Sequence, residues 1–181
     1  MISRHEAIAL VREHVGSESL INHMIAVEAV LRALARRFGE DEDLWGITGL
    51  LHDLDLGVLG DDLSRHGEVT VEMLEGKLPD EALQAIRVHP GELPRKTRLD
   101  SALYFADPIT GLIIAGTLMR PSKSLVDMTM KSLKKKFKDK RFAAGANRDQ
   151  IRACSELELD LDDFMSLALE AMREIHSDLG L

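Results

Sequence analysis

Several histidines of this sequence lie on the apolar faces of predicted helices, where a polar side chain is expected only if it is paired or binds something. His23 shares its helical stripe with Leu20 and Val27, and His89 follows Ile86 at helical spacing. The same test also places inward His52, His66 and Asp107. Imidazole nitrogens and carboxylate oxygens are the ligands that borderline and hard divalent metals prefer, so the set predicts a metal site.

Asp53 joins this set through its position next to His52. Neighbouring residues of a helix point about 100° apart, so both side chains reach one centre only if it lies between their directions. A carboxylate placed there could bridge two metal ions.

Each of these residues taken alone has a structural alternative. A single inward histidine is more often a hydrogen-bonded core residue than a ligand. Asp107 precedes Pro108, and Asp before Pro is typical of a helix N-cap followed by proline at the first helical position. We assign no function to the remaining histidines, which are His5, His14 and His176.

The elements that must position these residues are predicted to be helices. Apolar residues recur at three- and four-residue spacing nearly throughout, whereas sustained strand-like alternation is hard to find. We therefore expect an all-α bundle of eight or nine helices. Their predicted ranges are Arg4–His14, Glu18–Phe38, Glu42–Asp53, His66–Glu75, Asp80–His89, Arg98–Leu118, Ser124–Phe137, Arg148–Cys154 and Leu161–Ser177.

Length and composition favour one domain over residues 1–181, with a metal-bearing core at about 18–118 and residues 120–181 packed on it. The single cysteine, Cys154, leaves no partner for an intrachain disulfide, which suggests a reducing compartment, and we expect the cytoplasm. No signal peptide is evident, and no apolar run approaches the ~20 residues that span a bilayer. The net charge of −8 makes nucleic acid an unlikely partner.

One segment departs from this acidic balance, because residues 120–148 carry a local charge of +8. Arg120 and Lys123 follow the helix that bears Asp107, and their side chains are suited to binding a phosphate group. We interpret the lysines and arginine of residues 131–141 as the solvated face of an amphipathic helix. The alternative is that they steer an anionic substrate or meet an acidic partner.

The ordered set of residues resembles the HD superfamily of metal-dependent phosphohydrolases. Its minimal pattern is a histidine, a His-Asp pair and an aspartate on separate helices. These are His23, His52 with Asp53 in the run Gly-Leu-Leu-His-Asp-Leu-Asp, and Asp107 in Phe-Ala-Asp. The resemblance covers roughly Glu18 to Leu118, and the tail from Arg120 to Gly145 resembles that of one small branch of HD proteins.

The resemblance implies a dinuclear centre, because two further histidines are typical of the superfamily members that hold two metals. His23, His52, Asp53 and Asp107 would hold one ion, and His66, His89 and a bridging Asp53 the other. The resemblance favours iron or manganese, with zinc or magnesium as alternatives. The HD pair continues as Leu54-Asp55-Leu56-Gly57 instead of the Ile-Gly-Lys of cyclic-dinucleotide phosphodiesterases. The sequence therefore does not favour hydrolysis of a cyclic dinucleotide.

The function predicted from the sequence is hydrolysis of a phosphate ester or anhydride of a small anionic molecule, such as a nucleotide, by metal-activated water. Asp53 and Asp55 are the candidate catalytic residues; Asp55 would orient the water or a substrate hydroxyl, with a solvated loop acid as the alternative. Two other functions stay open: a di-iron oxygenase and a non-catalytic nucleotide-binding module. The sequence leaves the substrate, the metal and the oligomeric state open.

Overall fold

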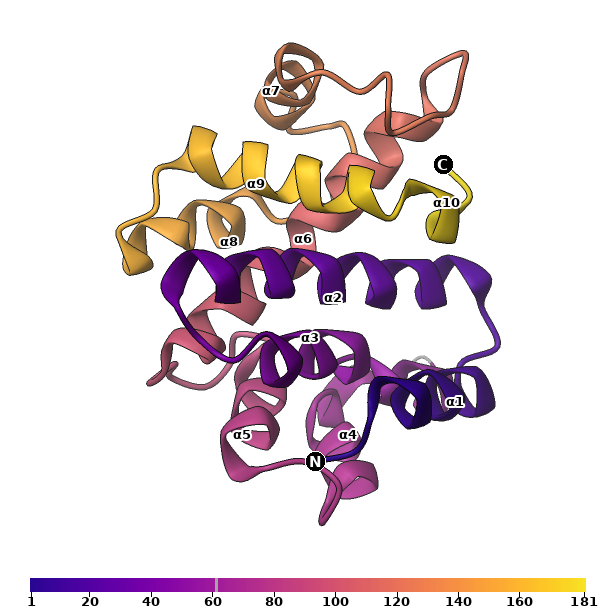
Figure 1. Cartoon of the computed structure of the whole chain (residues 1–181), viewed down its shortest axis with the longest axis vertical. Coiled ribbons are helices and arrows are strands. Elements are labelled where there is room, and N and C mark those ends of the chain that lie inside the picture. Colours follow the sequence, from indigo (N-terminus) through magenta and orange to yellow (C-terminus); the bar gives the residue numbers. More distant parts are fainter. Residues whose placement is uncertain (61) are drawn as a thin grey trace.

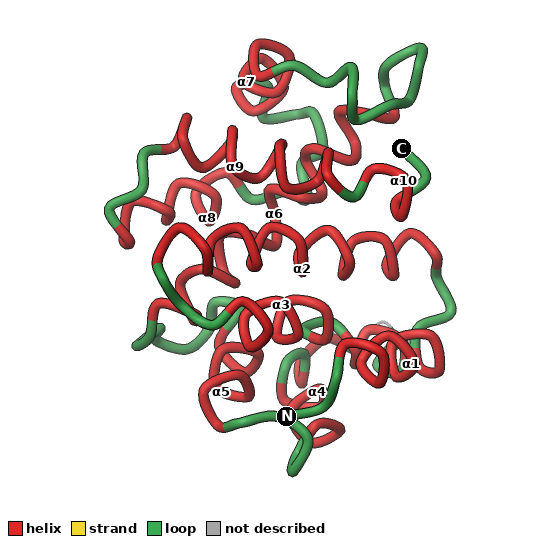
Figure 2. Tube along the Cα trace, in the orientation of Figure 1, coloured by secondary structure: helices red, strands yellow, loops and turns green. Residues whose placement is uncertain are grey.

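The structure is a computed structural model that describes residues 1–60 and 62–181. The regular elements of these residues are all helical, which confirms the all-α prediction (Figure 2). The α-helices are α1 (Arg4–His14), α2 (Glu18–Phe38), α3 (Glu42–Leu51), α4 (Glu68–Leu74), α5 (Asp80–Val88), α6 (Arg98–Leu118), α7 (Met130–Lys138), α8 (Arg148–Arg152), α9 (Leu161–Glu174) and α10 (His176–Leu179). Three short 3-10 helices join them: η1 (Leu54–Gly57), η2 (Leu63–Arg65) and η3 (Ala153–Leu157).

The helix α2 runs through the middle of the molecule and separates two groups of helices (Figure 1). On one side of it lie α1, α3, α4 and α5, and on the other lie α7, α8, α9 and α10, with α6 crossing behind. Buried apolar side chains from Ala7 in α1 to Leu179 in α10 form one contiguous core. The two halves of the chain are therefore joined by the helices that carry His23 and Asp107.

A glycine brings α3 close to α2. A Cβ atom at Gly49 would lie 2.9 Å from a methyl carbon of Leu31 and 3.1 Å from the backbone of Val27, closer than packed side chains tolerate. The two helix backbones approach each other because Gly49 has no side chain. This approach places the end of α3 beside the middle of α2.

Three of the predicted helices are shorter than the sequence suggested, and three of the predicted ligand histidines lie at or just before their ends. His52 is the C-cap of α3 and His89 the C-cap of α5. The prediction that His66 lies on the apolar stripe of a helix is wrong, because α4 begins at Glu68. Its N-cap, Gly67, has a φ of 84°, which a helix interior does not allow, and His66 precedes that break.

The C-terminal half differs from prediction in similar ways. The helix predicted over Ser124–Phe137 begins only at Met130, because Thr129 caps α7 by accepting a hydrogen bond from the Ser132 amide. The segment Leu161–Ser177 divides into α9 and α10, and Arg148–Cys154 ends in η3. None of these boundaries involves a predicted ligand.

The helix α6 carries Asp107 in its interior. Thr97 caps α6 and forms a capping box with Asp100, while Pro108 lies within the helix. The alternative that Asp107 is an N-cap is therefore wrong. Contrary to the sequence-based expectation, α6 is long and apolar enough to cross a membrane by length and composition, but 67% of its most apolar window is buried inside the protein, as in a core helix.

One buried arginine organises the loop between α7 and α8. The Arg148 guanidinium donates hydrogen bonds to the carbonyl oxygens of Ala143 and Ala146 at 2.6 Å and of Phe142 at 2.5 Å. Longer bonds reach the carbonyl oxygens of Lys136, Phe137 and Asp139. These bonds satisfy carbonyl groups at the end of α7 and hold residues 139–146 in one conformation against α6.

Candidate metal centre

The carboxylate of Asp53 lies among the Nε2 atoms of four histidines. Its Oδ2 is 3.4 Å from Nε2 of His23 and 3.2 Å from Nε2 of His52. Its Oδ1 is 3.4 Å from Nε2 of His66 and 3.3 Å from Nε2 of His89. Each oxygen therefore faces a different pair of imidazoles. The structure brings together all four histidines that the sequence analysis selected.

His52 and His89 are held in the same way, by the helix that each of them ends. The Nδ1 atom of His52 donates to the Gly49 carbonyl at 2.8 Å, and that of His89 to the Ile86 carbonyl at 2.6 Å. A carbonyl oxygen only accepts, so Nδ1 carries a proton in both rings and Nε2 is the ring nitrogen left to bind a cation. Free carbonyls at a helix C-terminus thus orient both imidazoles toward Asp53.

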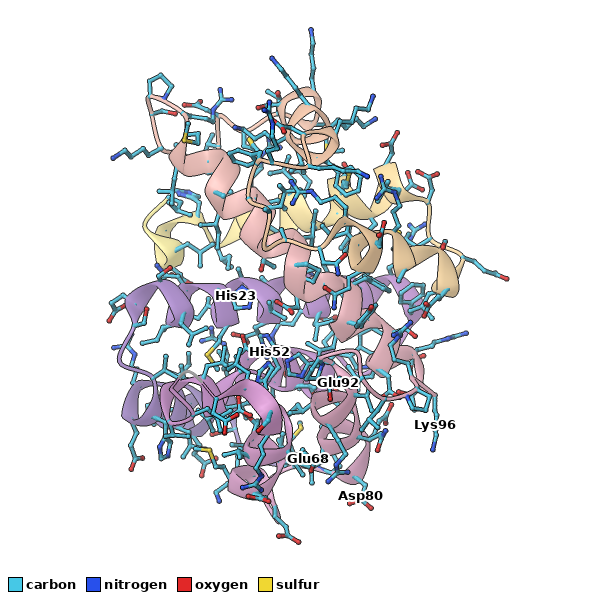
Figure 3. The ribbon with its side chains drawn as sticks, turned by 180° about the vertical axis from the view of Figure 1, so that it is seen from behind. His23, His52, Glu68, Asp80, Glu92 and Lys96 are labelled. Atoms are coloured by element: carbon cyan, nitrogen blue, oxygen red, sulfur yellow. The ribbon has the colours of Figure 1, made fainter. Side chains whose placement is uncertain are left out.

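His23 reaches the same centre from α2 (Figure 3). Its Nδ1 lies 2.9 Å from Oγ1 of Thr110, and that hydroxyl donates to the Asp107 carbonyl at 2.9 Å, so it accepts from the imidazole. On the other side of the ring, Nε2 lies 3.1 Å from Oδ1 of Asp107. Thr110 is therefore a positioning residue that the sequence analysis did not select, although it shares a helical face with Asp107.

Asp55 lies behind His66, and its placement corrects both sequence-based interpretations. Its Oδ1 accepts from Nδ1 of His66 at 2.9 Å, and its Oδ2 accepts from the amides of Gly67 at 2.7 Å and Thr70 at 3.3 Å. The side chain has no exposed surface, so Asp55 is not a solvated loop acid. Both oxygens face away from Nε2 of His66, so Asp55 orients the imidazole and the geometry does not support a role for it in orienting water.

The carboxylates and imidazoles strongly perturb one another's protonation. Burial alone would lower the pKa of His23, but hydrogen bonds and charges from Asp107 and Asp53 outweigh it and raise this pKa to about 10. Burial would raise the pKa of both carboxyls, but the neighbouring imidazoles hold the pKa of Asp107 below its usual value and that of Asp53 well below it. A cation that binds here must displace the proton on His23.

The donor set fits a divalent metal ion. The Nε2 atom of His52 is buried and makes no hydrogen bond within the described residues, which is costly for a polar atom unless it binds something else. Ligand atoms of two groups lie close enough to share an ion: His23, His52 and Asp107, and His52, Asp53 and His89. Nitrogen and carboxylate donors together suit iron, manganese and zinc.

The centre opens on the side of Asp107. Its side chain is 30% exposed, against 8% for Asp53 and none for His52. A cavity of about 350 Å³ lies at this side, and it is lined by His23, Asp107, Pro108, Gly111, Ala143, Gly145 and Ala146. The open side of the centre therefore lies between α6 and the loop that Arg148 holds.

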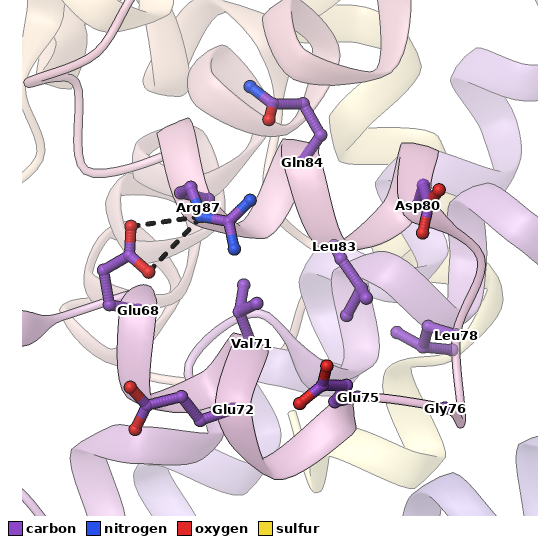
Figure 4. Close-up of a pocket in the computed structure, with 10 residues that line it drawn as sticks. All are labelled: Glu68, Val71, Glu72, Glu75, Gly76, Leu78, Asp80, Leu83, Gln84 and Arg87. Atoms are coloured by element: carbon purple, nitrogen blue, oxygen red, sulfur yellow. Dashed lines mark hydrogen bonds and ion pairs between the residues drawn. The ribbon is translucent and has the colours of Figure 1, made fainter.

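A larger cavity, of about 640 Å³, lies between α4 and α5, and none of the clustered histidines and aspartates lines it (Figure 4). Glu68 pairs there with Arg87 at 3.1 Å, while Glu72 and Glu75 line the same groove. Solvated carboxylates around a few apolar side chains supply no activated group. The histidine cluster, and not this groove, is therefore the candidate site.

The structure does not bring Arg120 and Lys123 to the centre, which corrects their prediction as phosphate-binding residues. Leu118 lies eleven positions after Asp107 in α6, so the helix carries the chain about 16 Å away before it reaches Arg120. Neither residue lines the cavity beside the cluster. The loop 143–146 lies there instead, and sequence reasoning missed it because its approach to Asp107 depends on the packing of α7 and α8.

Comparison with known proteins identifies the same part of the chain. The family model described as "HD domain" matches residues 20–121, more than half of the chain. Ribonuclease Y from Lactobacillus acidophilus is 30% identical to this chain over 94 residues. The match covers 51% of this chain but only 17% of that relative, so most of the relative has no counterpart in the aligned region.

Replacing Asp55 with asparagine is expected to destabilise the protein by about 1–3 kcal/mol, because one amide oxygen cannot accept from His66, Gly67 and Thr70 as two carboxylate oxygens do. The pKa of His66, which the Asp55 hydrogen bond raises, should fall. Urea unfolding and histidine titration by NMR measure the two effects. Asp127→Asn, in an exposed loop, is the control; equal stability of the two variants would contradict the positioning role.

Metal affinity is expected to rise with pH. The His23 pKa of about 10 lies above neutral pH, so each bound ion must displace a proton, and the cost of displacement falls as pH rises. The apparent affinity for Mn²⁺ should increase roughly tenfold per unit between about pH 6 and 9. Chelator-competition titrations measure this slope. Asp107→Asn should flatten it, and a pH-independent affinity of the unaltered protein would contradict the assignment.

Proposed function

We propose that this chain, which belongs to the HD domain family, is a metal-dependent hydrolase of phosphate esters or anhydrides in small molecules. One observation carries the proposal: the two oxygens of the buried Asp53 carboxylate face two different pairs of imidazoles. A carboxylate in that position can bind two cations at once. Two cations side by side suit reactions in which phosphate oxygens carry the charge.

The proposed ligands divide around Asp53. His23, His52 and Asp107 would hold one ion together with Oδ2 of Asp53, and His66 and His89 would hold the other together with Oδ1. Iron or manganese is proposed, because nitrogen and oxygen donors are mixed in both halves. Bound ions would lower the pKa of a coordinated water and neutralise charge on the phosphoryl oxygens.

The protein's own groups keep the ligands in place for this chemistry. Gly49, Ile86, Thr110 and Asp55 each accept or relay a hydrogen bond from the Nδ1 atom of one histidine. The imidazoles therefore cannot rotate away from Asp53 without breaking a hydrogen bond that is buried or partly buried. Because the ligands need no rearrangement when substrate arrives, the centre is preorganised.

A small substrate is favoured over nucleic acid. The named relative is a ribonuclease, and cleavage of RNA also breaks a phosphate ester. However, the net charge of −8 repels a polyanion, and the cavity of about 350 Å³ is at the small end of ligand pockets, which span ~300–1,000 Å³. We therefore propose a nucleotide or another small phosphoester as the substrate, and the cytoplasm as the location.

The proposal is tested by phosphate release from pyrophosphate, nucleotides and aryl phosphates, with Mn²⁺ or Fe²⁺ supplied. Asp53→Asn should lower the rate by about 100-fold or more, because even groups that only orient metal ligands cost 10–100-fold. Asp127→Asn should match the unaltered protein. Hydrolysis that survives Asp53→Asn would contradict the proposal.

The same assay under strict anaerobiosis separates the two enzyme classes considered. Hydrolysis needs no oxygen, so the rate with Mn²⁺ should be unchanged. Turnover that stops without oxygen would favour the di-iron oxygenase. A protein that binds nucleotide in the presence of metal but releases no product would favour the non-catalytic module.

A further inference from the structure

The cavity beside Asp107, which we call the Gly111 cavity, has an unusual lining. His23 and Asp107 form the side that faces the metal ligands. The remaining lining residues are small and uncharged: Pro108, Gly111, Ala143, Gly145 and Ala146. A ligand in this cavity thus meets charge on one side only.

Gly111 keeps this space open. It lies one helical turn beyond Asp107, inside α6, where glycine costs roughly 0.5–1 kcal/mol relative to alanine. A Cβ atom at this position would meet no atom within 4 Å, and Gly111 has no positive φ that would require glycine. Packing within the protein therefore does not explain the glycine. An added side chain would extend into the cavity instead.

The opposite wall is fixed in place. Arg148 donates to the carbonyl oxygens of Ala143 and Ala146 at 2.6 Å, and its own side chain is buried. Ala143 adopts a φ of 45°, which the loop tolerates because these hydrogen bonds hold it. The wall thus presents methyl groups and a glycine at a set distance from α6. Lys140 does not line the Gly111 cavity; it lines a separate hollow that shares Gly145 and Ala146 with it.

We propose that the Gly111 cavity binds the uncharged organic part of a phosphoester, a compact apolar or aromatic group, while its phosphoryl group lies at the metal centre. Gly111 limits the size of that group. This inference rests on the proposed function, because it assumes that phosphate binds beside Asp107. It excludes a second charged group next to the scissile bond, since no described residue of the lining other than His23 and Asp107 could pair with one.

Calorimetric titration of the Mn²⁺-loaded protein tests this with two probes that are not hydrolysed, inorganic phosphate and phenylphosphonate. The unaltered protein should bind phenylphosphonate about tenfold more tightly than phosphate, because only the former fills the cavity. Gly111→Leu should abolish this difference and leave phosphate affinity unchanged. Ala115→Leu, one turn further along α6 and outside the cavity lining, should behave like the unaltered protein.

Thermal unfolding shows whether the variants are folded. Gly111→Ala should raise the melting temperature by about 1–4 °C, because alanine favours the helix and clashes with nothing. If phosphate binds and phenylphosphonate binds no better, the cavity inference is overturned and the proposed function stands. If Gly111→Leu weakens both probes equally, the inference is likewise overturned. If neither probe binds the unaltered protein, the proposed function fails as well.

Discussion

The rest of the structure depends on the burial of one carboxylate. Asp53 is 8% exposed at its side chain and lies within 3.4 Å of four imidazole nitrogens. A buried charge of this kind costs several kcal/mol unless it is paired, so the surrounding groups must be held in place by other contacts. The hydrogen bonds behind each imidazole meet that requirement.

Helix ends supply much of the support, and this explains why short helices surround the site. A helix terminus leaves carbonyl groups without partners inside the helix, and His52 and His89 each use one of them as the anchor for Nδ1. The long helices α2 and α6 differ, because their candidate ligands do not lie at a helix end. They carry His23 and Asp107 in their interiors, and the contact between these residues links α2 to α6.

Much of this arrangement could be predicted, because burial leaves a periodic signal in the sequence. His23 and Asp107 lie on long regular helices, where the apolar stripe shows which side chains point inward. His66 was selected correctly as part of the cluster but for a wrong reason, since it precedes the break at Gly67 and lies on no helical stripe. A prediction of which residues cluster, made from their types, is less sensitive to an error in the helix boundaries than a prediction of the direction in which each side chain points.

What could not be predicted depends on contacts between distant segments. The environment of Asp55 is set by Gly67 and Thr70, which fold back onto it from beyond η2. Arg120 is near Asp107 in sequence, but α6 carries it away, and the loop around Ala143 takes its place. Proximity along the chain is therefore a poor guide to substrate contacts at the end of a long helix.

We propose that Asp53 would hold two metal ions, one at each carboxylate oxygen, and anomalous diffraction from crystals soaked in Mn²⁺ is the most direct test. We expect two anomalous peaks, one beside Oδ2 of Asp53 near His23 and His52, the other beside Oδ1 near His66 and His89. A single peak, or peaks that leave either oxygen without a metal neighbour, would contradict it.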